Sequence, residues 1–159
     1  MLVWITQGCI SEDEPSGPVL GPGDPLPQFS VIDNRGNIIS TSDFRDKTGV
    51  IIFFNTGCKD CRAEFPVIQQ VWEKYQGNPE VVLIAIAREE GEEEISAYWK
   101  ENNLTIPWSA QENRDVYSLF APSVIPRIYI SDSKCVITAS FDDSDMPSYS
   151  QLIEAIENS

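Results

Sequence analysis

Apolar residues along this chain follow two patterns, continuous runs and regular alternation with polar residues. Runs of about four to eight apolar residues between turn-forming residues are typical of buried strands, and alternation is typical of strands with one solvated face. Strands are therefore predicted at residues 29–32, 37–40, 49–54, 80–87, 127–130 and 135–141. Polar turns join the first two strands and the last two, so each of these pairs is predicted to form a β-hairpin.

Apolar residues spaced three or four apart predict helices between the strands. The predicted helices span residues 58–75, 91–102, 112–120 and 148–157, and a short capped turn is expected at 41–44. Pro66 lies inside the first helix, where a bend is expected because proline removes one backbone hydrogen bond. Strands that alternate with helices around two buried strands indicate one α/β sandwich domain over residues 29–159.

Residues 1–28 differ from the rest in composition. The first nine are apolar and end in Gly8-Cys9, and acidic residues and then many Pro and Gly residues follow. Such a segment has little apolar surface to bury, so we expect an extended tether. The apolar start is too short to span a membrane, but it resembles the end of a bacterial lipoprotein signal, with Cys9 as the lipidated residue. The alternative is an ordinary apolar leader with a free Cys9.

The stretch Cys58-Lys59-Asp60-Cys61 lies between a predicted buried strand and a predicted helix. This position places the Cys58 sulfur at a helix N-terminus, where unpaired backbone N–H groups and the helix dipole stabilise a thiolate. Lowering a thiol pKa from about 8.5 to about 7 takes roughly 2 kcal/mol, and a helix N-terminus supplies a large part of it. We interpret the motif as a redox site.

One face of the predicted helix continues from this motif. Its members are separated by three or four residues: Cys58, Cys61, Phe65, Ile68, Trp72 and Tyr75. Cys58 is expected at the helix tip, within reach of solvent, and Cys61 begins the inward-facing row. We therefore predict that Cys58 attacks a substrate disulfide and that Cys61 resolves the mixed disulfide.

Charge and residue types exclude several other functions. Eleven basic and twenty-five acidic residues give a net charge of −14, which repels nucleic acid and anionic membranes and favours solubility. The chain has no histidine, which removes Cys-His and Ser-His nucleophile pairs. Cys9 and Cys135 are scattered singly, so no metal site, cofactor or disulfide framework is predicted. We expect Cys135 to face the core from a strand; the alternative is a regulatory thiol.

Residues 23–159 resemble the thioredoxin superfamily, and within it the membrane-tethered TlpA/ResA-like branch. The matching motifs are Gly23-Asp24-Pro25-Leu26-Pro27-Gln28-Phe29, the hairpin at Gly36, Thr41-Ser42-Asp43-Phe44 before Lys47, Phe53-Phe54-Asn55 before the CxxC, Arg62-Ala63-Glu64-Phe65-Pro66 and Val124-Ile125-Pro126. They cover nearly the whole domain in the right order. The resemblance implies a thioredoxin-like three-layer sandwich with an added N-terminal β-hairpin.

The resemblance also implies roles for further residues. Pro126 takes the place of the family's cis-proline, and Ile125 before it would present its backbone to substrate; the alternative is a trans proline that starts a strand. Glu64 matches the acidic residue that modulates thiol ionisation in this branch, or else it is a solvated helix carboxylate. Two positions depart from the family motif: Gly57 stands where the family commonly has Trp, and Lys59-Asp60 lacks a frequent proline.

These features together predict a thiol-disulfide oxidoreductase that reduces protein disulfides outside the cytoplasm. A membrane thiol donor would keep it reduced, and cytochrome c maturation is one destination that the family suggests for its electrons. The protein is expected to be a monomer, anchored through a lipid on Cys9 in the bacterial cell envelope, at the periplasm or outer membrane. The acidic residues Glu12, Asp13 and Glu14 resemble surface-export signals of some Bacteroidetes lipoproteins.

Two other functions remain open at this point. One is a peroxiredoxin-like thiol peroxidase, whose N-terminal region looks similar. Those enzymes place Thr three residues before the reactive cysteine, whereas this chain has Asn55 there and Thr56 one residue later. The other is a non-enzymatic surface lipoprotein on a thioredoxin scaffold, in which the two cysteines form only a local staple.

Overall fold

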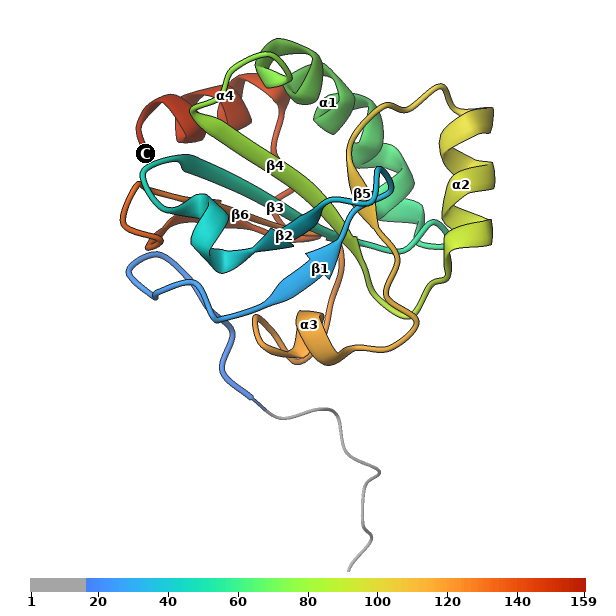
Figure 1. Ribbon diagram of the computed structural model, residues 1–159, viewed down its shortest axis with the longest axis horizontal. Helices are drawn as coiled ribbons and strands as arrows, with labels where there is room; N and C mark the ends of the chain where they lie inside the picture. The colour runs from blue at the N-terminus through green and yellow to red at the C-terminus, as the bar shows by residue number, and fades with distance from the viewer. Residues whose placement is uncertain (1–16) are drawn as a thin grey trace, which may run out of the picture.

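A mixed five-stranded sheet lies at the centre of the computed structural model, which describes residues 17–159 (Figure 1). In spatial order the strands are β5 (Trp108–Ser109), β4 (Val81–Ala87), β3 (Thr48–Phe54), β6 (Arg127–Ser131) and β7 (Ile137–Phe141). β3, β4 and β5 run parallel, whereas β6 pairs antiparallel with β3 and with β7. Phe54 pairs with Ala87, so the carboxyl ends of β3 and β4 lie side by side.

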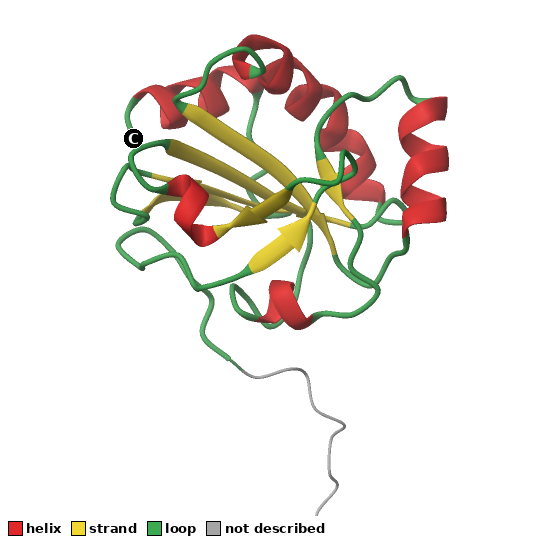
Figure 2. Cartoon of the chain, viewed as in Figure 1, coloured by secondary structure: helices red, strands yellow, loops and turns green. Residues whose placement is uncertain are grey.

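Helices and a small second sheet cover the two faces of this central sheet (Figure 2). One face carries α1 (Lys59–Tyr75), α2 (Glu92–Glu101) and α4 (Tyr149–Glu157), and Figure 1 shows α1 and α4 side by side. The other face carries α3 (Asp115–Ser118), the 3-10 helix η1 (Thr41–Phe44) and the antiparallel hairpin of β1 (Ser30–Ile32) and β2 (Ile38–Ser40). The predicted N-terminal hairpin is thus present, within one residue of its expected limits.

Both faces of the central strands are buried, which explains why their sequences are continuously apolar. Alternate residues of β3 point to opposite faces: Ile52 and Phe54 pack beneath α1 and α2, while Ile51 and Phe53 pack beneath the hairpin and α3. All four are at most 1% exposed. The predicted three-layer arrangement therefore follows from two separate apolar cores on one sheet.

The helix predicted at 112–120 is wrong in length, because α3 contains only Asp115–Ser118. The residues just before α3 pair with the segment after β4 instead of forming a helix. Gln111 forms a β-bridge with Glu90, and the carbonyl of Asn113 accepts a hydrogen bond from the Glu89 N–H at 3.1 Å. This extended pairing with the segment after β4 leaves only a single helical turn for the apolar residues that follow.

The domain begins earlier than the predicted boundary at Phe29. The Leu20 N–H donates to the Phe120 carbonyl at 2.9 Å, and the Leu26 N–H donates to the Cys135 carbonyl at 2.8 Å. Leu26 is only 5% exposed and belongs to the core beneath the hairpin. Residues 20–28 therefore pack on the domain instead of forming part of an extended tether, because their leucines have apolar surface to bury.

Candidate active site

The two cysteines of the CxxC motif lie where β3 gives way to α1. Cys58 is the N-cap residue of α1, and its Sγ accepts a hydrogen bond from the backbone N–H of Cys61 at 3.3 Å. This is the position at which a side-chain acceptor satisfies one of the free N–H groups of a helix start. Cys58 is half-buried, Cys61 is 1% exposed, and both are free thiols. The arrangement gives one accessible sulfur with a second sulfur behind it.

The inner thiol, Cys61, is harder to ionise because it is buried. Loss of hydration raises the pKa of the Cys61 thiol well above its ordinary value, and its contact with Cys58 raises it further. Cys61 is thus a neutral thiol in the reduced protein and needs a proton acceptor before it can attack a disulfide.

A short turn connects β3 to Cys58, and side chains fix its shape. The Asn55 carbonyl accepts a hydrogen bond from the Cys58 N–H at 3.0 Å, and the Asn55 side chain accepts one from the Gly57 N–H at 2.8 Å. The Asn55 amide also donates to the Arg88 carbonyl at 3.0 Å, which ties the turn to the segment after β4. Gly57 is exposed, so no large side chain covers the approach to Cys58 on this side.

Thr56 is held by Glu90, a contact that the sequence analysis missed. The Thr56 N–H donates to the Glu90 carboxylate at 2.8 Å, and the Thr56 hydroxyl donates to its other oxygen. The Thr56 carbonyl in turn accepts a hydrogen bond from the Arg62 guanidinium. The sequence does contain one indication of this contact. Thr56 follows β3 and Glu90 follows β4, and the carboxyl ends of adjacent parallel strands meet at one edge of a sheet.

Ile125 and Pro126 reach the site from the loop before β6. Their peptide bond is cis, the isomer that the resemblance implies. The Ile125 carbonyl lies 3.8 Å from the Cys58 Sγ, within the range of a weak S–H···O hydrogen bond. Ile125 is half-buried and Pro126 is buried. The structure thus brings together the CxxC motif and the loop that the resemblance assigns to substrate binding.

Glu64 lies one helical turn after Cys61 on α1. Its side chain is buried, with 3% exposure, so the alternative of a solvated helix carboxylate is wrong. Its Oε1 atom has no hydrogen-bond partner among the described residues, and burial raises the pKa of the Glu64 carboxyl to about 7. A carboxyl group with this pKa can take up and release a proton near neutral pH.

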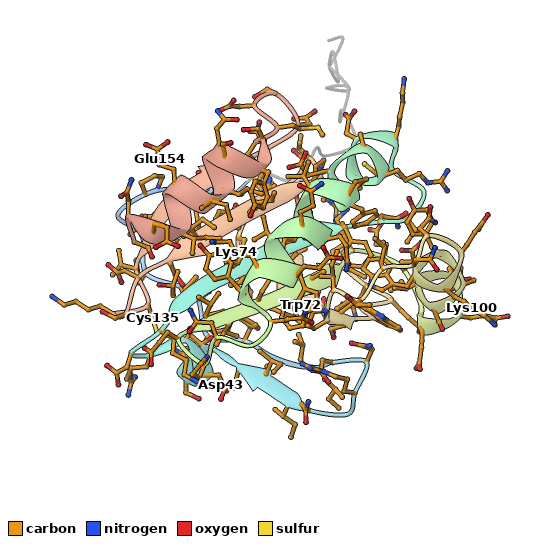
Figure 3. The ribbon with its side chains drawn as sticks, turned by 90° about the horizontal axis from the view of Figure 1, so that it is seen from above. Asp43, Trp72, Lys74, Lys100, Cys135 and Glu154 are labelled. Atoms are coloured by element: carbon orange, nitrogen blue, oxygen red, sulfur yellow. The ribbon has the colours of Figure 1, made fainter. Side chains whose placement is uncertain are left out.

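The other cysteines do not join this site. Cys135 lies in the turn between β6 and β7, at a φ of 59°, and not on a strand as predicted. It is half-buried, its Sγ lies 3.8 Å from the Thr41 carbonyl, and Figure 3 shows it at the end of the sheet near Asp43. Burial raises the pKa of its thiol. Cys9 lies outside the described residues.

No group of three or more His, Cys, Asp and Glu side chains within residues 17–159 is placed to hold a metal ion. No helix in the same range has both the length and the apolar composition needed to cross a bilayer.

Comparisons with known proteins identify relatives of the whole domain. The model of the AhpC/TSA family matches residues 22–140. The thiol-disulfide oxidoreductase ResA of Bacillus cereus is 25% identical over 80% of this chain and 71% of its own length. ResA of Bacillus subtilis is 23% identical over 86% and 78%. These matches confirm the predicted resemblance.

A solved structure confirms the predicted fold. The thioredoxin domain of a thiol-disulfide oxidoreductase from Bacteroides vulgatus superposes with a TM-score of 0.71 at 22% identity, covering 86% of this chain and 99% of that domain. The thioredoxin-like sandwich and the added N-terminal hairpin are thus both present.

Proposed function

Because this chain belongs to the AhpC/TSA family, we propose that it is a thiol-disulfide oxidoreductase that reduces extracytoplasmic protein disulfides through Cys58 and Cys61. The observation that carries the proposal is the placement of the two sulfurs. Cys58 caps α1 and receives the Cys61 N–H at 3.3 Å, while Cys61 is buried directly behind it. The names of the ResA relatives support the same reaction class.

The reaction moves two electrons from the Cys58/Cys61 dithiol to a client, which is the protein whose disulfide is reduced. The Cys58 thiolate attacks one sulfur of the client disulfide, which breaks the client S–S bond, forms a mixed disulfide and releases one client thiolate. Cys61 then loses its proton and attacks the Cys58 sulfur, which releases the second client thiolate and leaves a Cys58–Cys61 disulfide. The two released thiolates take up the two protons that the enzyme thiols lost.

Glu64 supports the second step. The Cys61 proton is held tightly because the thiol is buried, so attack requires a nearby base. Glu64 is one turn away on the same helix, burial raises its carboxyl pKa to about 7, and its Oε1 has no hydrogen-bond partner within residues 17–159. We assign it the role of proton acceptor for Cys61.

The remaining features of the proposal concern location and partners. A lipid on Cys9 would anchor the protein, a monomer, at the cell envelope, and residues 11–19 after it, which are acidic and then contain Pro and Gly, fit a spacer. A membrane dithiol would return the Cys58–Cys61 disulfide to its reduced state. The lipoprotein-like sequence that ends at Cys9 supports the anchor.

The geometry of the site argues against the peroxidase alternative. The Thr56 hydroxyl donates to Glu90, so it is not directed at the Cys58 sulfur. Among residues 17–159, no guanidinium hydrogen-bonds to the Cys58 Sγ, whose partners are the Cys61 N–H and the Ile125 carbonyl. The groups that would polarise a bound peroxide are therefore not assembled.

Reduction of insulin disulfides tests the proposed reaction. The reduced protein should precipitate insulin chains, Cys58→Ser should abolish this activity, and Cys135→Ser should retain it because Cys135 lies in a distant turn. Peroxide consumption faster than that of free cysteine would favour the peroxidase. A wild-type protein with no exchange activity and a permanently oxidised pair would favour the binding lipoprotein.

The direction of electron flow has its own test. The purified domain is equilibrated in graded thiol buffers, and the oxidised fraction of the Cys58/Cys61 pair is measured by alkylation and mass spectrometry. A potential below about −220 mV supports reduction of clients, and one above about −150 mV supports their oxidation.

A further inference from the structure

Side chains hold three consecutive backbone carbonyls in the loop before Pro126. Each carbonyl accepts a hydrogen bond from a different residue. The pairs of donor and acceptor are Arg114 and Pro122, Arg127 and Ser123, and Tyr117 and Val124. We call Arg114, Tyr117 and Arg127 the carbonyl clamp. All three carbonyls thereby accept hydrogen bonds from side chains of the protein.

Arg127 forms the most extensive of these contacts. Its Nε and Nη2 donate to the Ser123 carbonyl at 3.0 and 2.7 Å, and its Nε lies 3.4 Å from the Tyr117 hydroxyl. The residue is only 8% exposed, and its nearest carboxylate is Asp142 at 3.9 Å. Burial of a guanidinium is unfavourable unless hydrogen bonds replace its hydration. The Arg127 guanidinium therefore remains hydrogen-bonded to the loop.

Tyr117 holds the next carbonyl. Its hydroxyl donates to the Val124 carbonyl at 2.6 Å, and its ring packs edge-on against Phe53 with the centroids 5.4 Å apart. Arg88 lies over the same ring at 5.0 Å. The ring is thus fixed by packing, and the hydroxyl is the part that acts on the loop.

The backbone between the clamp and Pro126 has an uncommon shape. Val124 has a φ of 77°, a region that β-branched residues rarely adopt because the side chain meets the backbone. Its side chain is 36% exposed. The next carbonyl, of Ile125, faces the Cys58 Sγ at 3.8 Å. Such a conformation persists only where surrounding contacts hold it, and the clamp supplies those contacts.

We propose that Arg127 and Tyr117 are positioning residues that fix the backbone of Ile125 for a client peptide. The Ile125 N–H has no hydrogen-bond partner within residues 17–159, so an extended segment beside the client disulfide can pair with this backbone. The exposed Val124 side chain adds an apolar contact next to it. The inference rests on the proposed oxidoreductase function and identifies what aligns a polypeptide disulfide with Cys58.

Two disulfide substrates of different size distinguish a loss of client positioning from general damage to the thiols or the fold. Insulin has a peptide backbone beside its disulfides, whereas hydroxyethyl disulfide has none. Tyr117→Phe removes one hydroxyl and keeps the ring, and Arg127→Lys keeps the charge but loses the two-nitrogen contact. Tyr75→Phe is the matched control, because its hydroxyl donates to Glu157 at 2.6 Å, at the end of α1 far from this loop.

If the clamp positions the client, its variants should lose activity with insulin but not with hydroxyethyl disulfide. The kcat/KM for insulin should fall about tenfold in Tyr117→Phe and in Arg127→Lys, since small misplacement of reacting groups costs rate steeply. The rate with hydroxyethyl disulfide should change less than about twofold, and Tyr75→Phe should match wild type with both. If Arg127→Lys fails to fold, Tyr117→Phe alone still decides the question.

Other outcomes overturn the inference. Equal losses with both disulfides would show a general effect on the thiols or the fold, and unchanged kcat/KM for insulin would show that the clamp does not act on clients. Wild-type protein that reduces neither disulfide would instead refute the proposed function, and the role in client binding with it.

Discussion

The Cys61 backbone N–H lies 3.3 Å from the Cys58 sulfur and donates a hydrogen bond to it, so a sulfur serves as the N-cap of α1. The contact links helix formation to redox chemistry. The N-cap acceptor of an ordinary helix is a Ser, Thr, Asp or Asn oxygen, and here the same position is held by the sulfur that we propose attacks substrate. The half-buried Cys58 and the buried Cys61 therefore differ in access although only two residues separate them.

The difference in access predicts the order in which the thiols react with iodoacetamide. Cys58 should be alkylated more than about tenfold faster than Cys61, because buried thiols are inert until the protein opens. Cys135, whose pKa is raised by burial, should react more slowly than Cys58. Peptide mapping after timed alkylation measures all three. Faster labelling of Cys61 than of Cys58 would reverse the assigned roles.

Glu64 should make stability depend on pH. The folded-state pKa is about 7 and the ordinary value is 4.5, so ionisation of this carboxyl favours unfolding. The cost is absent below pH 4.5, grows between pH 4.5 and 7, and reaches at most about 3 kcal/mol above pH 7. Glu64→Gln removes a charge and keeps the shape, so it should gain stability relative to wild type as the pH rises.

Urea unfolding of both proteins at about pH 4.5 and about pH 8 measures this effect. The difference in unfolding free energy between Glu64→Gln and wild type should be larger at the higher pH. A difference that stays constant across this range would mean that Glu64 has an ordinary carboxyl pKa.

Loss of Glu90 should destabilise the turn before Cys58. Glu90→Ala leaves the N–H and the hydroxyl of Thr56, a 6% exposed residue, without their acceptor, which costs about 1–3 kcal/mol. Glu89→Ala is the control, because it removes only a half-exposed ion pair with Arg114 at 3.5 Å, worth about 0.5 kcal/mol. Urea unfolding at neutral pH compares the two, and equal effects would count against a structural role for Glu90.

Gly49 should tolerate no side chain. A Cβ at this position of β3 would meet the Ser131 hydroxyl and the fully buried Phe44 ring, so Gly49→Ala is expected to lose about 1–3 kcal/mol. Gly77→Ala provides the control, since nothing lies within 4 Å of its added carbon. Thermal unfolding of the two variants gives the comparison, and similar melting temperatures would disprove the close contact.

Local sequence pattern predicted the parts of the fold that local forces determine. Continuous apolar runs located β3 and β4, and the turn around Gly36 located the first hairpin, because each signal reflects burial or backbone preference within one segment. The CxxC motif was placed correctly at the start of α1 for the same reason.

Parts that depend on contacts between distant segments were not predicted. β5 has only two residues and exists through its pairing with Ala85 and Ile86. Leu26 was assigned to a tether because nothing beside it in the sequence shows that it is buried. Arg127 directly follows the cis-proline, yet its hold on Ser123 is visible only once the loop is folded. The residues adjacent in sequence do not show which distant segments will come into contact.

Trapping of a mixed disulfide identifies the cysteine that attacks a client disulfide. Reduced Cys61→Ser protein is incubated with insulin, quenched with acid, and mapped by mass spectrometry for the cysteine joined to an insulin chain. A stable adduct is expected at Cys58, absent in Cys58→Ser and unaffected by Cys135→Ser. An adduct at Cys135, or no adduct while wild type still reduces insulin, would contradict the proposed role of Cys58.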